Sequence, residues 1–241
     1  MPPARPLYVF APADWAALAA WLCAWLGYGF YAERVGDRKP NLMASVAAFR
    51  RVWMREAYHR DPRITDVGLI GNLMQSATFF SSTTLLVLGA TLAVLGTVER
   101  GAEVVEVMRN LPFAQRLTQE MLESKLLVLI FVFVYAFFRF TWSLRQFNLV
   151  NIMVGAFPAR REDQLPDDPL IVTAGRLNEL AGLNFTQGLR AYYYAMPLLL
   201  WLIGPTLLAA GTAITTLVLY YMEFRSATVR ALADDRSRIR P

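Results

Sequence analysis

Long uncharged runs separated by charged segments divide this chain. Val67–Val98 and Ala191–Met222 each extend for 32 residues without Asp, Glu, Lys or Arg, and Trp15–Ala32 does so for 18. A fourth run, from Leu126 to Arg145, is interrupted only by Arg139. A bilayer is crossed by about 20 apolar residues in a helix. The pattern predicts an all-α, polytopic membrane protein, a single membrane domain over residues 1–241 with four transmembrane helices at about 15–32, 69–98, 126–147 and 191–222.

The polar segments between these runs predict amphipathic interfacial helices. After Pro40, Asn41 is a suitable N-cap, and apolar residues then recur on one helical face at Leu42, Val46, Phe49, Trp53 and Ala57. Arg50 and Arg51 lie away from that stripe. Such a helix, with Phe49 and Trp53 on its apolar side, suits the membrane interface or the protein's own cytoplasmic surface, and both interpretations stay open. Pro112 divides residues 99–125 into two shorter amphipathic helices.

The second uncharged run has a polar first half. Asn72, Gln75 and Ser76 cluster on one side of the predicted helix, and lipid offers such groups no partners, so this side should face the bundle or a water-filled cavity. In a four-span topology Arg139 lies at a similar depth, and we expect it to point at this helix. The predicted polar cluster, a candidate vestibule, consists of Asp66, Asn72, Gln75, Ser76, Arg139, Arg145 and Asn148.

Two interpretations of this cluster follow. In one, Arg139 extends to the interface and the polar side of the second helix only joins helices together. In the other, the residues line a vestibule of positive potential that is open to the cytoplasm and suited to an anion or an acidic headgroup.

Charge in the loops gives an orientation. With four spans, residues 33–66 and 143–190 share one side and hold 13 Lys and Arg residues, against 10 in the remaining polar segments. The excess is small, but the first loop is strongly basic, and cytoplasmic loops are enriched in Lys and Arg. We therefore expect these two loops in the cytoplasm and both termini outside, in a bacterial cytoplasmic (inner) membrane.

Composition excludes several classes of protein. The sequence pI is about 9.6, yet the basic residues are scattered through the loops, which favours contact with anionic membrane lipids over nucleic acid. The chain has one cysteine, Cys23, and one histidine, His59, so it cannot form an internal disulfide or supply a Cys/His zinc site. No phosphate-binding loop, dinucleotide fingerprint or nucleophile elbow is present. We predict no cofactor, no metal and no catalytic residue.

Several motifs resemble one family over nearly the whole chain, from about Trp25 to Tyr221. They are Arg51-x-Trp53-Met54, Arg60-Asp61-x-Arg63-Ile64-x-Asp66, Phe79-Phe80-Ser81-Ser82-Thr83, and Gly188-Leu189-Arg190-Ala191-Tyr192-Tyr193-Tyr194 continuing to Trp201 with Gly204-Pro205. The chain resembles the domain of unknown function 599 family, uncharacterised integral membrane proteins of bacteria and plants. The resemblance implies a four-helix membrane architecture, but no reaction and no catalytic residue.

Three classes of function stay open. The first is a non-enzymatic membrane protein, either a homo-oligomer or an accessory subunit bound to other membrane-protein subunits. The second is an oligomeric channel or transporter for a small anion, lined by the polar side of the second span. The third is a lipid-modifying enzyme, which fits the sequence least well because no convergent catalytic set accompanies His59 or the serines.

Overall fold

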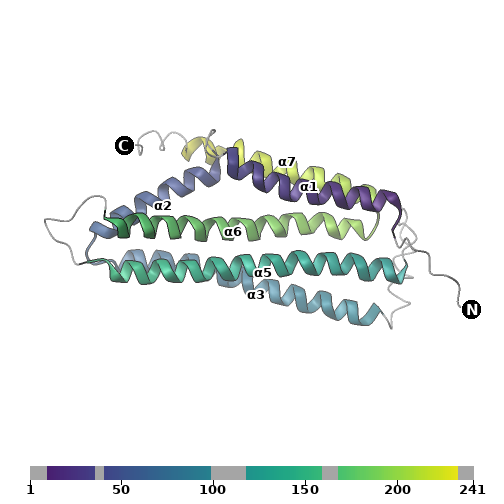
Figure 1. Ribbon diagram of the computed structural model, residues 1–241, viewed down its shortest axis with the longest axis horizontal. Helices are drawn as coiled ribbons and strands as arrows, with labels where there is room; N and C mark the ends of the chain where they lie inside the picture. The colour runs from purple at the N-terminus through teal and green to yellow at the C-terminus, as the bar shows by residue number, and fades with distance from the viewer. Residues whose placement is uncertain (1–9, 36–40, 99–117, 159–167, 233–241) are drawn as a thin grey trace, which may run out of the picture.

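Every regular element of the computed structural model is an α-helix. The structure describes residues 10–35, 41–98, 118–158 and 168–232, and no strand occurs among them. Most of the helices lie along one long axis (Figure 1). They are α1 (Pro12–Val35), α2 (Leu42–His59), α3 (Ile64–Val98), α5 (Gln119–Ala156), α6 (Pro169–Trp201) and α7 (Pro205–Phe224). The predicted all-α class is confirmed, and the two amphipathic helices expected around Pro112 lie largely outside the described residues.

Three helical stretches are long and apolar enough to cross a membrane, which is the mark of a membrane protein. They are Ile64–Thr97 in α3, Gln119–Ala156 in α5, and Pro205–Leu232, which contains α7. The predicted spans at 69–98 and 126–147 thus lie within longer helices. The predicted span at 15–32 lies within α1, which is not one of these three stretches.

The single helix expected over 191–222 is wrong, because the chain reverses direction between Trp201 and Pro205. Proline has no N–H, so Pro205 cannot donate to the carbonyl of Trp201 four residues earlier. That carbonyl instead accepts a hydrogen bond from Nζ of Lys125, at 2.7 Å. Gly204 then adopts an extended conformation, and α7 runs back along α6, with the hydroxyls of Tyr194 and Thr216 3.0 Å apart (Figure 1).

This reversal makes α7 parallel to α1. The ring of Phe10, just before α1, stacks on Trp201 at 5.4 Å, and Tyr31, near the end of α1, lies 5.7 Å from Phe224 at the end of α7. The start of α1 and the end of α7 therefore lie at opposite ends of this pair of helices, whereas the four-span topology placed them on the same side.

The bundle has two parts, which Figure 1 shows side by side along its axis. We call the trunk the part in which α1 and α7 pack against α6, whose other side packs against α5, with α3 beyond it. The helices α3, α5 and α6 continue past the ends of α1 and α7, and α2 packs against this extension, which we call the head. Each part has its own core: Trp21, Phe140 and Tyr194 belong to the core of the trunk, and Met54 and Phe147 to that of the head.

The contact between α5 and α6 connects the two parts. Gly188 on α6 faces the ring of Phe140, so closely that a Cβ at this position would lie 2.6 Å from a ring carbon. Toward the head, Ser143 donates a hydrogen bond to the carbonyl of Ala181 at 2.8 Å. Small and hydroxyl residues let membrane helices approach closely, and this pair uses both.

Gly188→Ala should destabilise the fold although alanine is the better helix former. The added methyl has no space against Phe140, and overpacking costs about 1–3 kcal/mol, against a gain in helix propensity of about 1 kcal/mol. We expect a lower thermal unfolding midpoint in detergent. Gly71→Ala on α3, where nothing lies within 4 Å of the added Cβ, is the control and should be neutral or stabilising. An equal effect of the two changes would contradict the close packing.

Candidate functional site

The structure does not assemble the predicted vestibule, because Arg139 points away from α3. Its Nη1 donates to Oδ1 of Asn184 on α6 at 2.8 Å, and its Nε donates to the hydroxyl of Tyr135 at 2.9 Å. Asn184 in turn donates to Gln146 at 2.8 Å. The predicted contact of Arg139 with Asn72, Gln75 or Ser76 is therefore wrong. The partners of Arg139 are instead Tyr135 on its own helix and Asn184 on α6, which lies in the segment 143–190 that the sequence assigned to a loop between spans.

The other members of the predicted cluster lie in three places. Asp66 is fully buried and accepts hydrogen bonds from Nε1 of Trp53 at 2.8 Å and from Arg60 at 2.6 Å, so it joins α2 to α3. Arg145 and Asn148 line a shallow groove between α3 and α5. The remaining three are exposed on the outer side of α3: Asn72, Gln75 and Ser76.

The face that α2 buries differs from the predicted stripe. Its buried residues are Ser45, Met54, Ala57 and Tyr58, which overlap with the stripe only at Ala57. Val46 is exposed, whereas Arg50, expected on the polar side, lies against α6. This helix therefore packs on the protein's own surface. Insertion of Phe49 and Trp53 among lipid headgroups stays a prediction.

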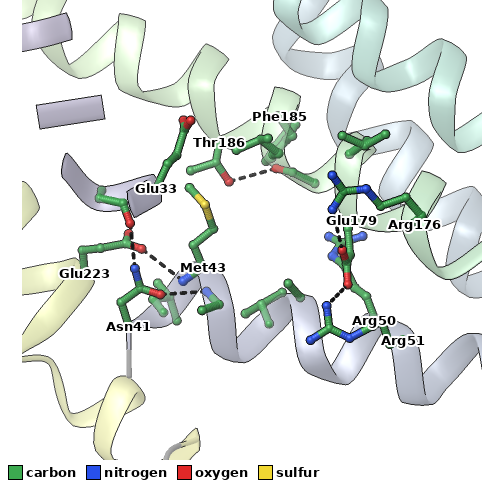
Figure 2. Close-up of a pocket in the computed structure, with 18 residues that line it drawn as sticks. Glu33, Asn41, Met43, Arg50, Arg51, Arg176, Glu179, Phe185, Thr186 and Glu223 are labelled. Atoms are coloured by element: carbon green, nitrogen blue, oxygen red, sulfur yellow. Dashed lines mark hydrogen bonds and ion pairs between the residues drawn. The ribbon is translucent and has the colours of Figure 1, made fainter. Parts of the chain in front are cut away.

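A pocket of about 460 Å³ lies between α2 and α6, next to the ends of α1 and α7 (Figure 2). One end is acidic and the other basic, with apolar side chains of α2 and α6 between them. Its charged and amide residues are Glu33, Asn41, Arg50, Arg51, Arg176, Glu179 and Glu223.

The acidic end is built around the first turn of α2. Asn41 caps this helix, accepting from the Ala44 amide at 2.8 Å while its own amide donates to the carbonyl of Ala32 at 2.9 Å. Glu223 accepts the amide of Met43 at 3.0 Å. The first amides of a helix have no intrahelical acceptor, so α1 and α7 supply part of what α2 needs to begin here.

Glu33 belongs to the same end and is also engaged. It accepts hydrogen bonds from Gln187 at 2.8 Å and from Nη1 of Arg190 at 3.4 Å. Only 4% of Arg190 is exposed, its guanidinium lies over the ring of Tyr28, and its Nη2 has no hydrogen-bond partner within the described residues. This buried cation lies next to the pocket, at the level where the trunk meets the head.

At the basic end, one carboxylate serves two arginines and a third arginine is left without one. Glu179 forms ion pairs with Arg51 and with Arg176. Nη1 of Arg50 donates to Oδ1 of Asn178 at 2.5 Å, and Arg50 has no carboxylate within 4.0 Å in the described parts of the chain. Burial lowers the pKa of the Arg50 guanidinium from its usual value, and the carboxylate of Glu179 acts in the opposite direction.

Gly182 makes the position of Arg50 possible. A Cβ at residue 182 would lie 2.9 Å from Cζ of Arg50, so the guanidinium rests directly on the backbone of α6. Its other face lies toward Phe147, with Cζ 5.5 Å from the ring centroid. Sequence reasoning missed this packing because Gly182 lies on another helix, and it missed Glu33, Glu223 and Arg190 because these three charges only mark the ends of uncharged runs. The cap at Asn41, which the sequence did predict, was the one local clue to the pocket.

A family model, whose description is protein of unknown function DUF599, matches residues 16–228. The chain belongs to this family. The resemblance based on the motifs from Arg51 to Pro205 is thereby confirmed. DUF599 has no assigned activity, and comparison with curated proteins and with solved structures finds no match. The chemistry of this DUF599 member must therefore be argued from its own side chains.

Those side chains are equipped for binding. The pocket offers guanidinium donors, carboxylate acceptors and an apolar wall. Within the described residues, no group of three or more His, Cys, Asp or Glu side chains is placed to hold a metal ion. The arrangement suits a ligand that carries charge at one end and apolar groups at the other.

Asn41→Ala should loosen α2 from the trunk. It removes both the N-cap of α2 and the bond to Ala32, and loss of an N-cap alone costs about 1 kcal/mol. We expect faster hydrogen–deuterium exchange in the first turns of α2 and unchanged exchange in α5. Asn41→Asp keeps the cap and lacks the donor to Ala32, so its effect should be intermediate. Identical exchange in all three proteins would contradict the role of Asn41.

Proposed function

We propose that this DUF599 protein is a non-enzymatic membrane protein that associates with a second copy of itself through the outer face of α3 in the head. This outer face consists of Val67, Leu69, Asn72, Gln75, Ser76 and Phe79. One observation supports the proposal: α3 is uncharged over a length that a bilayer cannot cover.

The uncharged run of α3 is longer than the bilayer is thick, whereas those of α1 and α7 match it. Residues 67–98 are all uncharged, which at 1.5 Å per residue makes about 48 Å, whereas the hydrocarbon core is about 30 Å thick. The uncharged runs of α1 and α7 are 18 residues each, or about 27 Å, which fits one bilayer. These two helices end where the head begins. The outer face of α3 in the head thus lies beyond the membrane, yet it has no charged side chain.

The composition of this face suits a protein partner. Phe79 is 64% exposed and Leu69 45%, while the amides of Asn72 and Gln75 lie between them in sequence. Apolar side chains supply area for burial, and amides can hydrogen-bond to their equivalents across a two-fold axis. α3 packs mainly against α5, so its outer face is open to a second molecule (Figure 1).

The position of Arg139 argues against the alternative function, an anion channel. That interpretation needed Arg139 beside Asn72 and Gln75 to attract the anion. Arg139 is bound to Asn184 on α6, so of the two predicted cations only Arg145, in the groove between α3 and α5, lies near the outer face of α3. Self-association requires only the apolar and amide side chains that the outer face of α3 exposes.

We further propose that the head lies in the cytoplasm. The reversal at Pro205 brings the end of α7 to the same end of the trunk as the head. Among the described residues, the segments at this end, 33–35, 41–66, 143–158, 168–190 and 223–232, hold 11 Lys and Arg residues, and the segments at the opposite end, 10–14 and 118–125, hold one. Positive residues are retained on the cytoplasmic side, so this distribution supports a bacterial inner membrane with the head inside.

Self-association can be tested by adding like charges to the face. Asn72→Glu with Gln75→Glu should convert the dimer to a monomer, because four carboxylates would meet across a two-fold interface. Light scattering of the detergent-solubilised protein measures the mass. Thr173→Glu, on the exposed surface of α6, is the control and should leave the dimer intact.

Cross-linking in native membranes completes this test. In a Cys23→Ser background, Ser76→Cys should give a cross-linked dimer and Thr173→Cys should not. A monomeric parent protein, or association with a different membrane protein only, would refute self-association and favour an accessory subunit.

Orientation can be tested by thiol labelling in the same Cys23→Ser background. Arg55→Cys, exposed on the head, should react with a membrane-impermeant maleimide only after the cells are permeabilised. Gln119→Cys, at the opposite end of the bundle, should react in intact cells. The reverse pattern would place the head outside and overturn the assignment.

A further inference from the structure

We infer that the pocket between α2 and α6 binds the phosphate-bearing headgroup of an anionic phospholipid, with Arg50 as its anchor. This inference does not depend on self-association, because the pocket lies among α1, α2, α6 and α7 and the outer face of α3 takes no part in it. Three observations support it: the unused donors in the pocket, its mixed lining, and its level in the bundle.

The unused donors point to an anion. Each carboxylate of the pocket already accepts from the protein: Glu223 from an α2 amide, Glu33 from Gln187, and Glu179 from two arginines. Arg50, in contrast, uses only Nη1, and its Nε and Nη2 make no hydrogen bond within the described residues. These two groups form the fork that binds phosphate or carboxylate oxygens in a bidentate way. A ligand that completes this pocket must bring acceptors.

A half-buried guanidinium without a carboxylate partner has a desolvation cost, which also favours a bound anion. Arg50 is held by a neutral amide and by the face of Phe147. Transfer of a charge out of water is compensated only by pairing and full hydrogen bonding. Burial lowers the pKa of Arg50 because it disfavours the charged guanidinium, and an anion bound beside it would stabilise that charge.

The lining points to an amphiphile rather than to a free ion. The lining also includes the apolar side chains Leu42 and Val46 of α2 and Leu183 and Phe185 of α6 (Phe185 is labelled in Figure 2). Inorganic phosphate would leave these apolar walls in water. A headgroup followed by its glycerol and the first carbons of an acyl chain would contact both the arginine and the walls.

The level of the pocket agrees with a lipid of the cytoplasmic leaflet. Ala32, Glu33 and Glu223 line it, and these residues stand at the ends of α1 and α7, where the apolar trunk gives way to the charged head. A lipid with its acyl chains beside the trunk has its glycerol near this height, and its phosphate points along α2 toward Arg50, about two turns further into the head. The pocket volume of about 460 Å³ is sufficient for a headgroup and lies within the usual range for ligand sites.

The test compares three probes on the purified protein in a mild non-ionic detergent. Dioleoylphosphatidylglycerol is the anionic lipid, dioleoylphosphatidylcholine the zwitterionic one, and inorganic phosphate the free anion. Thermal unfolding and native mass spectrometry report stabilisation and bound lipid. We expect phosphatidylglycerol to raise the unfolding midpoint and to be retained as one molecule per chain, and the other two probes to have much weaker effects.

Variants assign the effect to Arg50. Arg50→Gln should weaken the binding of phosphatidylglycerol by about tenfold or more, the factor expected for a lost hydrogen bond to a charged group. Arg55→Gln, an exposed arginine on the same helix, is the matched control and should bind like the parent.

A glycine pair separates binding from folding. Gly182→Ala displaces the guanidinium without removing it, and should weaken binding although its fold is intact. Gly175→Ala gains the same helix propensity, but its Cβ meets Arg51 at an ordinary 3.6 Å, so it should bind normally.

Several results would overturn the inference. Equal stabilisation by both lipids would show that the anionic headgroup is not recognised. Equal stabilisation by inorganic phosphate would assign the pocket to a free anion. Undiminished binding by folded Arg50→Gln and Gly182→Ala proteins would remove Arg50 from the site.

Discussion

The backbone break after Trp201 determines the architecture of this protein. Pro205 leaves the carbonyl of Trp201 without an intrahelical donor, and the ammonium of Lys125, itself buried, supplies one at 2.7 Å. The indole of Trp201 donates to the buried carboxylate of Asp14, which lies 4.0 Å from that ammonium. Side chains from the first turn of α1 and the second turn of α5 thus stabilise the end of α6. An unsatisfied carbonyl in an apolar environment costs several kcal/mol, so the reversal depends on this arrangement.

The rest of the fold follows from this reversal. Because α7 returns beside α1 and runs parallel to it, both end at the same level and both contribute to the start of α2. The carbonyl of Ala32 and the carboxylate of Glu223 meet the first turn of that helix from two directions. A continuous helix over 191–222 would have taken Glu223 away from Met43, and α2 would have had no such support.

The sequence predicted the membrane segments well and their connection poorly. Uncharged runs locate α3 and α5 because a helix in lipid needs an apolar segment of sufficient length, and that length can be read directly along the sequence. The same criterion could not detect the turn at Gly204, since membrane helices commonly tolerate proline when neighbouring groups satisfy the freed carbonyl. The length of the run, about 48 Å for 32 residues, did not reveal the turn either, because the equally long run Val67–Val98 forms the continuous helix α3.

The polar site was harder to predict, because its contacts join residues far apart in sequence. Arg139 bonds to Tyr135 four residues earlier on its own helix, but only the fold brings it to Asn184. Arg50 lies off the apolar stripe of α2, and nothing local shows that Gly182 on another helix leaves space for it. The cap at Asn41 was predictable because capping is a local interaction.

The direction of α2 explains why its pocket has two unlike ends. The N-terminus of a helix carries a partial positive charge, so Glu33 and Glu223 are favourably placed near the first turn of α2. These carboxylates are therefore stabilised without drawing on Arg50, which lies about two turns further along the helix. The arginine stays available to an outside acceptor, while Asn41 holds the same helix to α1. An anion bound at Arg50 would thus contact a helix that packs against α6 in the head and is joined to α1 of the trunk through Asn41.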